Sequence, residues 1–143
     1  MNATMEKFGW PETKLAETAH WAVMLRPEQP TAGALVVACK EPAKAFGEVS
    51  AAGFADLGAV VAKVEATLAA AIGYEKINWL MLMMVDPDVH FHVIPRYEGA
   101  RALAGVEVSD AGWPGPPALG VSAKPNAAEI AAMLASLRAD WPA

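Results

Sequence analysis

Residues 88–94 read DVHFHVI, a stretch in which titratable and apolar side chains alternate. Alternation with a period of two residues is typical of a β-strand that has one face in a core. Residues two positions apart in a strand project from the same face, roughly 6–7 Å apart. Asp88, His90 and His92 are therefore expected to line up on one face. The apolar residues between them would anchor the other face in the core, so the stretch predicts three titratable groups on a rigid support.

Two imidazoles placed in this way can divide one displacement at phosphorus into two easier steps. A neutral imidazole is a good nucleophile near pH 7, and a second one can donate a proton to phosphate oxygens and stabilise the developing charge. One of the two histidines, His90 or His92, could therefore be the nucleophile and the other the stabilising group. A protonated Asp88 would act as a general acid, whereas a charged one would raise the pKa of an imidazole that it touches. Arg26 and Arg96 are the candidate donors to substrate phosphates.

The rest of the chain predicts strands around one long helix, which is an α+β arrangement. Ser50 is suited to cap the start of this helix and Gly73 to follow its end. A turn is expected at residues 86–88, where proline lies between two aspartates. Strands are expected at residues 14–18, 20–25, 35–39, 76–85 and 89–97. The apolar stripe of the long helix is expected to consist of Phe54, Leu57, Val61, Val64, Leu68 and Ile72.

We expect a single domain over residues 1–143, with its core in residues 15–97 and an irregular segment at 98–125. Asn126 is expected to cap a terminal helix at residues 126–141. The irregular segment is rich in Gly and Pro, and it is longer than most connections within a domain. Trp113 and its neighbouring prolines are expected either to cover a substrate pocket or to pack on the body as a tail. The Met-rich run at residues 80–84 is expected in the core or at a subunit interface.

The stretch at 88–94 resembles the signature of the histidine-triad (HIT) family, His-φ-His-φ-His-φ-φ, where φ is apolar. Six of the seven positions match, with His90 on the family's middle histidine, its nucleophile, and His92 on the third. Upstream, GALVVACK at residues 33–40 looks like the family's Gly-His-apolar-apolar-Val-Ile-Pro-Lys strand. The resemblance covers about residues 15–97. It implies a HIT-like fold, in which an antiparallel sheet of about five strands carries one long helix and a C-terminal helix. It also implies a small-molecule nucleotide as substrate and a homodimer, with no cofactor.

Several positions depart from the family's pattern. Asp88 stands where the family has its first histidine, and Ala34 replaces another histidine. Met84 and Val85 stand where well-studied branches have Gln-Ser or Gln-Thr to hold phosphate. Arg26 stands where an acidic residue often grips the ribose. These departures predict either a substrate that differs from those of the best-known branches or a loss of activity.

The predicted function is that of a nucleotide-phosphate hydrolase or nucleotidyl transferase, acting at the α-phosphorus through a covalent nucleotidyl-histidine on His90. Dinucleoside polyphosphates and nucleoside phosphoramidates are the expected substrate classes. Two alternatives stay open. One is a catalytically weak dimer that binds nucleotides or a protein partner. The other is a metal-binding protein that uses Asp88, His90 and His92, although three groups on one strand converge poorly on a tetrahedral zinc ion.

Composition argues against several other classes of protein. The net charge of −5, with no block of like charges, argues against a general nucleic-acid binder, which needs a clustered basic face. No apolar run is long enough to span a bilayer, so no membrane association is expected. Cys39 is the only cysteine, so no intrachain disulfide forms. A reducing, cytoplasmic location is therefore expected.

Overall fold

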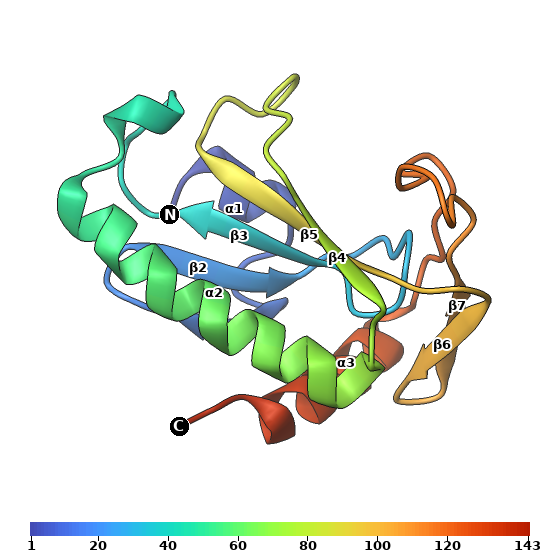
Figure 1. Cartoon of the computed structure of the whole chain (residues 1–143). Coiled ribbons are helices and arrows are strands. Elements are labelled where there is room, and N and C mark those ends of the chain that lie inside the picture. The colour runs from blue at the N-terminus through green and yellow to red at the C-terminus, as the bar shows by residue number, and fades with distance from the viewer.

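Five strands form one antiparallel sheet in the computed structural model, which describes all 143 residues (Figure 1). The strands are β1 (Lys14–Glu17), β2 (Trp21–Leu25), β3 (Leu35–Cys39), β4 (Lys76–Leu80) and β5 (His90–Arg96). Their spatial order is β1-β2-β3-β5-β4, and every neighbouring pair is antiparallel. The predicted α+β class and the five-stranded antiparallel sheet are confirmed.

The centre of the sheet is covered on both faces. Every residue of β2 and β3 is buried, as the continuous apolar run at residues 35–39 predicts. Trp21, Val23 and Leu25 point to one face, whereas Ala22 and Met24 belong to a separate cluster on the other. Because side chains alternate along a strand, this division also fixes which face the residues of β5 can reach.

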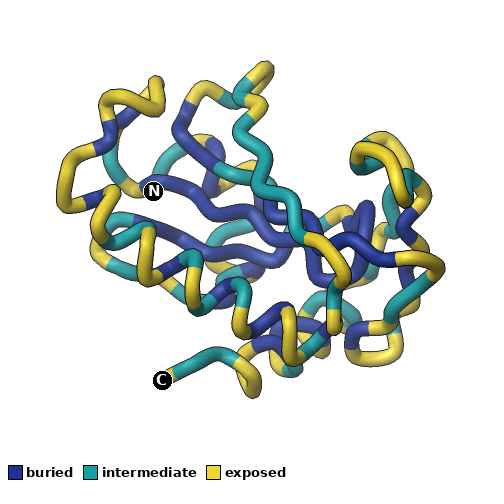
Figure 2. Tube along the Cα trace, in the orientation of Figure 1, coloured by how far each residue is buried: buried dark blue, intermediate teal, exposed yellow.

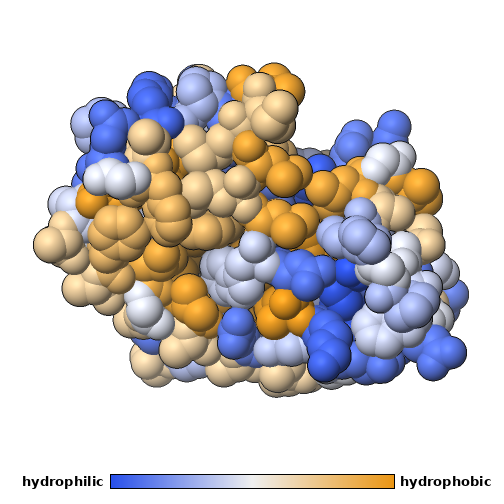
Figure 3. All heavy atoms as spheres, turned by 45° about the horizontal axis from the view of Figure 1, so that its top comes forward, coloured by the Kyte–Doolittle hydropathy of each residue, from blue (hydrophilic) through white to orange (hydrophobic).

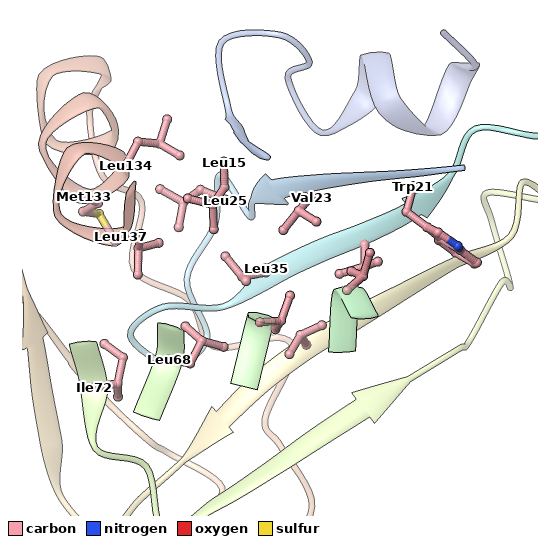
Figure 4. Packing of buried hydrophobic residues seen from close by; sticks show 14 of the residues in the cluster. Leu15, Trp21, Val23, Leu25, Leu35, Leu68, Ile72, Met133, Leu134 and Leu137 are labelled. Carbon is pink, nitrogen blue, oxygen red and sulfur yellow. The ribbon is translucent and has the colours of Figure 1, made fainter. Parts of the chain in front are cut away.

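Two helices cover one face of the sheet (Figure 1). Helix α2 (Ala51–Ile72) begins and ends where the sequence predicts: the Ser50 hydroxyl accepts from the Gly53 N–H, and Gly73 adopts a left-handed φ of 63°. Helix α3 (Ala127–Asp140) is capped by Asn126, also as predicted. The large core between these helices and the sheet includes Leu15, Val23, Leu25, Leu35, Leu68, Ile72, Met133, Leu134 and Leu137 (Figure 4).

The predicted apolar stripe of α2 is wrong at its N-terminal end. Phe54 is 41% exposed and packs on Phe46 with ring centroids 5.3 Å apart. Gly53 is buried instead, because the Trp21 indole N–H donates to its carbonyl at 2.8 Å. A Cβ at Gly53 would lie 2.9 Å from Val49 Cγ1, so only glycine lets the helix approach so closely. The buried residues of α2 are Gly53, Val60, Val64, Thr67, Leu68 and Ile72.

A short N-terminal helix, α1 (Ala3–Lys7), covers part of the opposite face, and the sequence did not predict it. The Asn2 side chain caps it by accepting from the Met5 N–H at 3.0 Å. Met5 and Phe8 bury the small cluster on this face, whose other members are Ala22, Met24, Val36 and Ala38. A single 3₁₀ turn, η1 (Phe46–Glu48), precedes α2.

Strand β4 ends at Leu80, and the prediction of a strand over residues 76–85 is wrong in its second half. After Leu80, which lies opposite His92, the chain leaves the sheet, and Met83 takes a positive φ of 50°. Met84 is 88% exposed, so this part of the Met-rich run does not lie in the core. The buried centre and the more exposed β4 are seen along the trace in Figure 2.

Residues 98–125, predicted as irregular, contain a β-hairpin of β6 (Ala100–Leu103) and β7 (Val106–Ser109). Its two turn residues, Ala104 and Gly105, both have positive φ values, of 50° and 81°. This is the geometry that a two-residue type I′ turn requires. Ala104 is an uncommon choice there, which explains why no turn signal was visible. None of the helices has the length and hydropathy that a membrane span needs.

Candidate functional site

A pocket of 470 Å³ opens on the side of the sheet that carries α1. Its volume is typical of sites for small molecules. The side chains of His90 and His92 contribute to it from β5, where the predicted alternation directs both to the same face. Three other segments complete the lining, namely residues 7–8, 26–28 and 82–86.

His90 lies in the part of β5 that pairs with β3, and Ala38 of β3 lies opposite it. The residue is 1% exposed. Its Nδ1 lies 2.6 Å from the carbonyl oxygen of Asp88. A carbonyl only accepts hydrogen bonds, so Nδ1 carries the proton and Nε2 carries the lone pair. The backbone thus fixes the tautomer in which Nε2 is nucleophilic.

His92 lies beside His90, with ring centroids 5.1 Å apart and the rings edge to face. Its pKa is lowered from 6.5 to about 4, first by burial and then by the charges of His90 and Arg26. At neutral pH His92 is therefore uncharged. In the free protein it can offer one N–H as a hydrogen-bond donor, but it does not hold the extra proton expected of a general acid.

This pKa determines how stability responds to acid. Between about pH 4 and 6.5 the unfolded chain binds a proton at His92 that the folded chain does not. The free energy of unfolding therefore falls as pH drops through this window, by on the order of 3 kcal/mol from this residue. We expect His92→Gln to remove most of the slope in urea unfolding measured between these pH values. Equal slopes for the variant and the wild type would contradict the lowered pKa.

Two polar atoms in this pocket are buried without a hydrogen-bond partner: Arg26 Nε and His92 Nδ1. The Arg26 guanidinium donates from one Nη to the Glu28 carbonyl at 2.7 Å, which leaves Nε for another acceptor. A buried polar group without a partner costs about 1–3 kcal/mol. An anionic ligand that accepts from the Arg26 Nε–H would remove that cost.

The N-terminal residues form one wall of the pocket, which sequence reasoning missed. The Phe8 ring packs edge to face on His92, with centroids 5.6 Å apart, and also contacts His90 at 6.1 Å. Lys7 pairs with Asp86 at 2.7 Å across the pocket mouth. The sequence does carry a signal for helix α1: Asn2 can cap a helix, and the apolar residues at positions 5 and 8 have the spacing of one helical face.

The Asp88 carboxylate lies on the side of the sheet that carries α1, as the two imidazoles do, but it is not part of the pocket lining. Strand β5 begins at His90, but Val89 already belongs to the core cluster on the opposite face, so the alternation extends back to residue 88. The Asp88 carboxylate accepts from the backbone N–H and hydroxyl of Thr4, at 3.3 and 3.0 Å, and is paired with Lys44. No group of three or more His, Cys, Asp or Glu side chains is arranged to hold a metal ion. The metal-binding alternative therefore loses its third ligand.

Arg96 lies outside this pocket. Its guanidinium binds both carboxylate oxygens of Asp110, at 2.7 and 3.2 Å, as well as Asn78 and the Gly115 carbonyl. With these acceptors it ties the C-terminal segment to β4. Trp113 lies beside Arg96 at a second, smaller hollow, so it packs on the body and does not cover the histidines.

Solved structures with the same arrangement of strands and helices are known. A histidine triad protein of Sinorhizobium meliloti 1021 matches with a TM-score of 0.77 and 23% identity, over 98% of this chain and 95% of its own. One of Bradyrhizobium japonicum matches with a TM-score of 0.75 and 18% identity, over 99% and 96%. The chain has the histidine-triad fold.

A more distant match with this fold is a hypothetical histidine triad nucleotide-binding protein of Sulfolobus tokodaii strain 7. Its TM-score is 0.68 and its identity 18%, over 90% of this chain and 82% of its own. No protein-family model and no curated protein matches the sequence. The assignment of this fold therefore rests on the similarity of the structures and not on the sequence. The chain combines that fold with a pocket lined by His90, His92 and Arg26.

Proposed function

We propose that this histidine-triad protein is a nucleotide-phosphate hydrolase or nucleotidyl transferase with His90 as its nucleophile. The observation that carries the proposal is the 2.6 Å contact between His90 Nδ1 and the Asp88 carbonyl, in a residue that lines a ligand-sized pocket. This contact leaves the lone pair on Nε2, as covalent catalysis by imidazole requires. The unpartnered Arg26 Nε supports an anionic substrate.

The reaction has two steps. In the first, His90 Nε2 attacks the α-phosphorus, a P–N bond forms, and the leaving group departs with the electron pair of its bond to phosphorus and takes up a proton. In the second, water attacks the same phosphorus, which releases a nucleoside monophosphate and restores the imidazole. The Asp88 carbonyl stabilises the positive charge that develops on His90. The N–H of His92 donates to a phosphate oxygen, a role that a neutral imidazole can perform.

Nucleoside phosphoramidates and dinucleoside polyphosphates are the proposed substrate classes, since both place a leaving group on the α-phosphorus. The test is a panel of adenylyl and guanylyl compounds of both classes, followed by chromatography of the products. Acid quenching and intact mass should also detect the nucleotidyl adduct, with the adduct peptide mapping to residues around His90. Turnover without an adduct, or an adduct mapped elsewhere, would contradict the proposed mechanism.

A binding protein without catalysis is the second candidate, and the wall at residues 82–85 favours it. Leu82, Met84 and Val85 are exposed and line the pocket, and their side chains carry no donors for a phosphate. Calorimetry with adenine nucleotides distinguishes the two functions. Binding without product across the whole panel would favour the binding protein, whereas product formation would exclude it.

We also propose that the chain forms a homodimer through the free edge of β4. Only one side of β4 is paired, by β5, and an unpaired edge is a template for another strand. In the view of Figure 3, apolar residues gather on the half of the surface that holds η1 and much of α2. Phe46 of η1 and Phe54 of α2 are exposed hydrophobic residues of these elements. Light scattering after gel filtration should give the mass of two chains, and Phe54→Glu should lower it. The mass of one chain for the wild type would exclude the dimer.

A further inference from the structure

Asp88 is a charged residue buried under the short N-terminal helix. It is 2% exposed, and the partners of its carboxylate are distant in sequence. Thr4 donates its backbone N–H and its hydroxyl to Oδ2, at 3.3 and 3.0 Å, and Lys44 donates to Oδ1. The Lys44 ammonium lowers the pKa of Asp88, and the bonds from Thr4 act in the same direction against the effect of burial. The carboxylate is therefore charged at neutral pH, with both of its oxygens bound.

The same residue contacts the nucleophile through its backbone. The Asp88 carbonyl accepts from His90 Nδ1 at 2.6 Å, so the orientation of this peptide group sets which nitrogen of His90 is protonated. The next residue is held as well: Val89 donates to the Ala43 carbonyl at 3.2 Å and accepts from the Cys39 N–H at 2.9 Å. The side chain of Asp88 and the backbone of Val89 thus fix the peptide that faces His90.

We propose that Asp88 is a positioning residue, and that its clamp to Thr4 and Lys44 holds the Asp88 carbonyl where it fixes the tautomer and orientation of His90. This inference rests on the proposed function, in which His90 is the nucleophile. Asp88 itself lies outside the pocket lining and touches no substrate there. A carboxylate at this position therefore orients the imidazole through the backbone, and it does not repel a phosphate bound in the pocket.

The clamp has a second consequence for the pocket. Thr4 belongs to α1, and the same helix leads into Lys7 and Phe8, which line the pocket. Binding of Thr4 by Asp88 therefore ties one pocket wall to the strand that carries the nucleophile. Lys44 lies in the loop before η1, and its side chain is 60% exposed. Replacing Lys44 removes one arm of the clamp without creating a cavity in the core.

Nitrogen-15 NMR of the histidine side chains tests the clamp directly, because it reports which ring nitrogen carries the proton and needs no substrate. In the wild type we expect His90 almost entirely as the Nδ1–H tautomer. Lys44→Met and Asp88→Asn should give a mixture of tautomers. Lys44→Arg should restore the wild-type pattern, because it keeps the cation. Lys14→Met is the matched control: it also removes a lysine that pairs with a carboxylate, but at β1 and far in sequence from Asp88.

Kinetics with the best substrate add a second readout. A misplaced catalytic group can cost up to about 100-fold in rate, so we expect Lys44→Met to lower kcat by about tenfold to 100-fold with KM little changed. If Asp88→Asn fails to fold, Lys44→Met and Lys44→Arg still decide. An unchanged His90 tautomer in Lys44→Met, with unchanged kcat, would overturn the clamp while leaving the proposed function intact. If Lys44→Met shifts the His90 tautomer but the wild-type protein turns over no substrate of the panel, the proposed function is refuted and the clamp is supported.

Discussion

Replacing His90 with glutamine should abolish turnover, by a factor on the order of 10⁴ or more, because loss of a covalent nucleophile removes the reaction path itself. Glutamine is close in size to histidine and can donate its amide N–H to the Asp88 carbonyl, so the pocket should keep its shape. It has no nitrogen lone pair able to attack phosphorus. The measurement is the initial rate on the best substrate from the panel, with binding followed by calorimetry.

His20→Gln is the matched control for His90→Gln. His20 is a histidine outside the pocket, with Nδ1 3.2 Å from a Glu41 carboxylate oxygen. We expect this variant to retain the wild-type rate. His90→Gln should still bind the substrate, since Arg26 and the apolar wall are untouched. Substantial residual turnover in His90→Gln, with His20→Gln unchanged, would show that another group attacks phosphorus.

The part of the site that the sequence could predict is the part governed by local periodicity. Alternation along β5 places both imidazoles on one face, and it holds because β3 pairs with β5 at both histidines. The same alternation places the Asp88 carboxylate on that side, but its bonds to Thr4 and Lys44 hold it outside the pocket lining. Periodicity predicts the face of a side chain and not its partners. Thr4 and Lys44 are distant in sequence from Asp88, so this environment could not be predicted.

Contacts between distant segments explain most of the remaining differences. Thr4 meets Asp88 across 84 positions of sequence, and Phe8 meets the histidines only because α1 folds over the sheet. Phe54 was placed in the core by its spacing, but contacts of Gly53 with Trp21 and the neighbouring loop turn it outward. The ends of α2 were predicted correctly, since caps such as Ser50 and Gly73 act within one turn.

The two arginines named from the sequence should behave in opposite ways when replaced by methionine. Arg96→Met removes one partner of a buried ion pair, because the side chains of Arg96 and Asp110 are only 5% and 1% exposed. Burial alone would raise the pKa of Asp110, but Arg96 and the backbone N–H groups of Tyr97 and Gly112 together lower it below its usual value, so the carboxylate is charged in the folded protein. Leaving that charge unpaired costs about 3–5 kcal/mol. Urea unfolding at fixed protein concentration and neutral pH should show this loss.

Arg26→Met is the comparison that separates structure from ligand binding. The Arg26 side chain has one hydrogen bond, to the Glu28 carbonyl, and its Nε is unpartnered, so its replacement should change the free energy of unfolding by less than about 1 kcal/mol. Its loss should weaken an anionic ligand about tenfold or more, since hydrogen bonds to charged groups contribute about 1.5–3 kcal/mol. Asp110→Asn should destabilise as Arg96→Met does, because it leaves the guanidinium buried without a counter-charge. If Arg96→Met instead weakened ligand binding and left stability unchanged, Arg96 would be a substrate contact, and the pocket at the histidines would extend to the C-terminal segment.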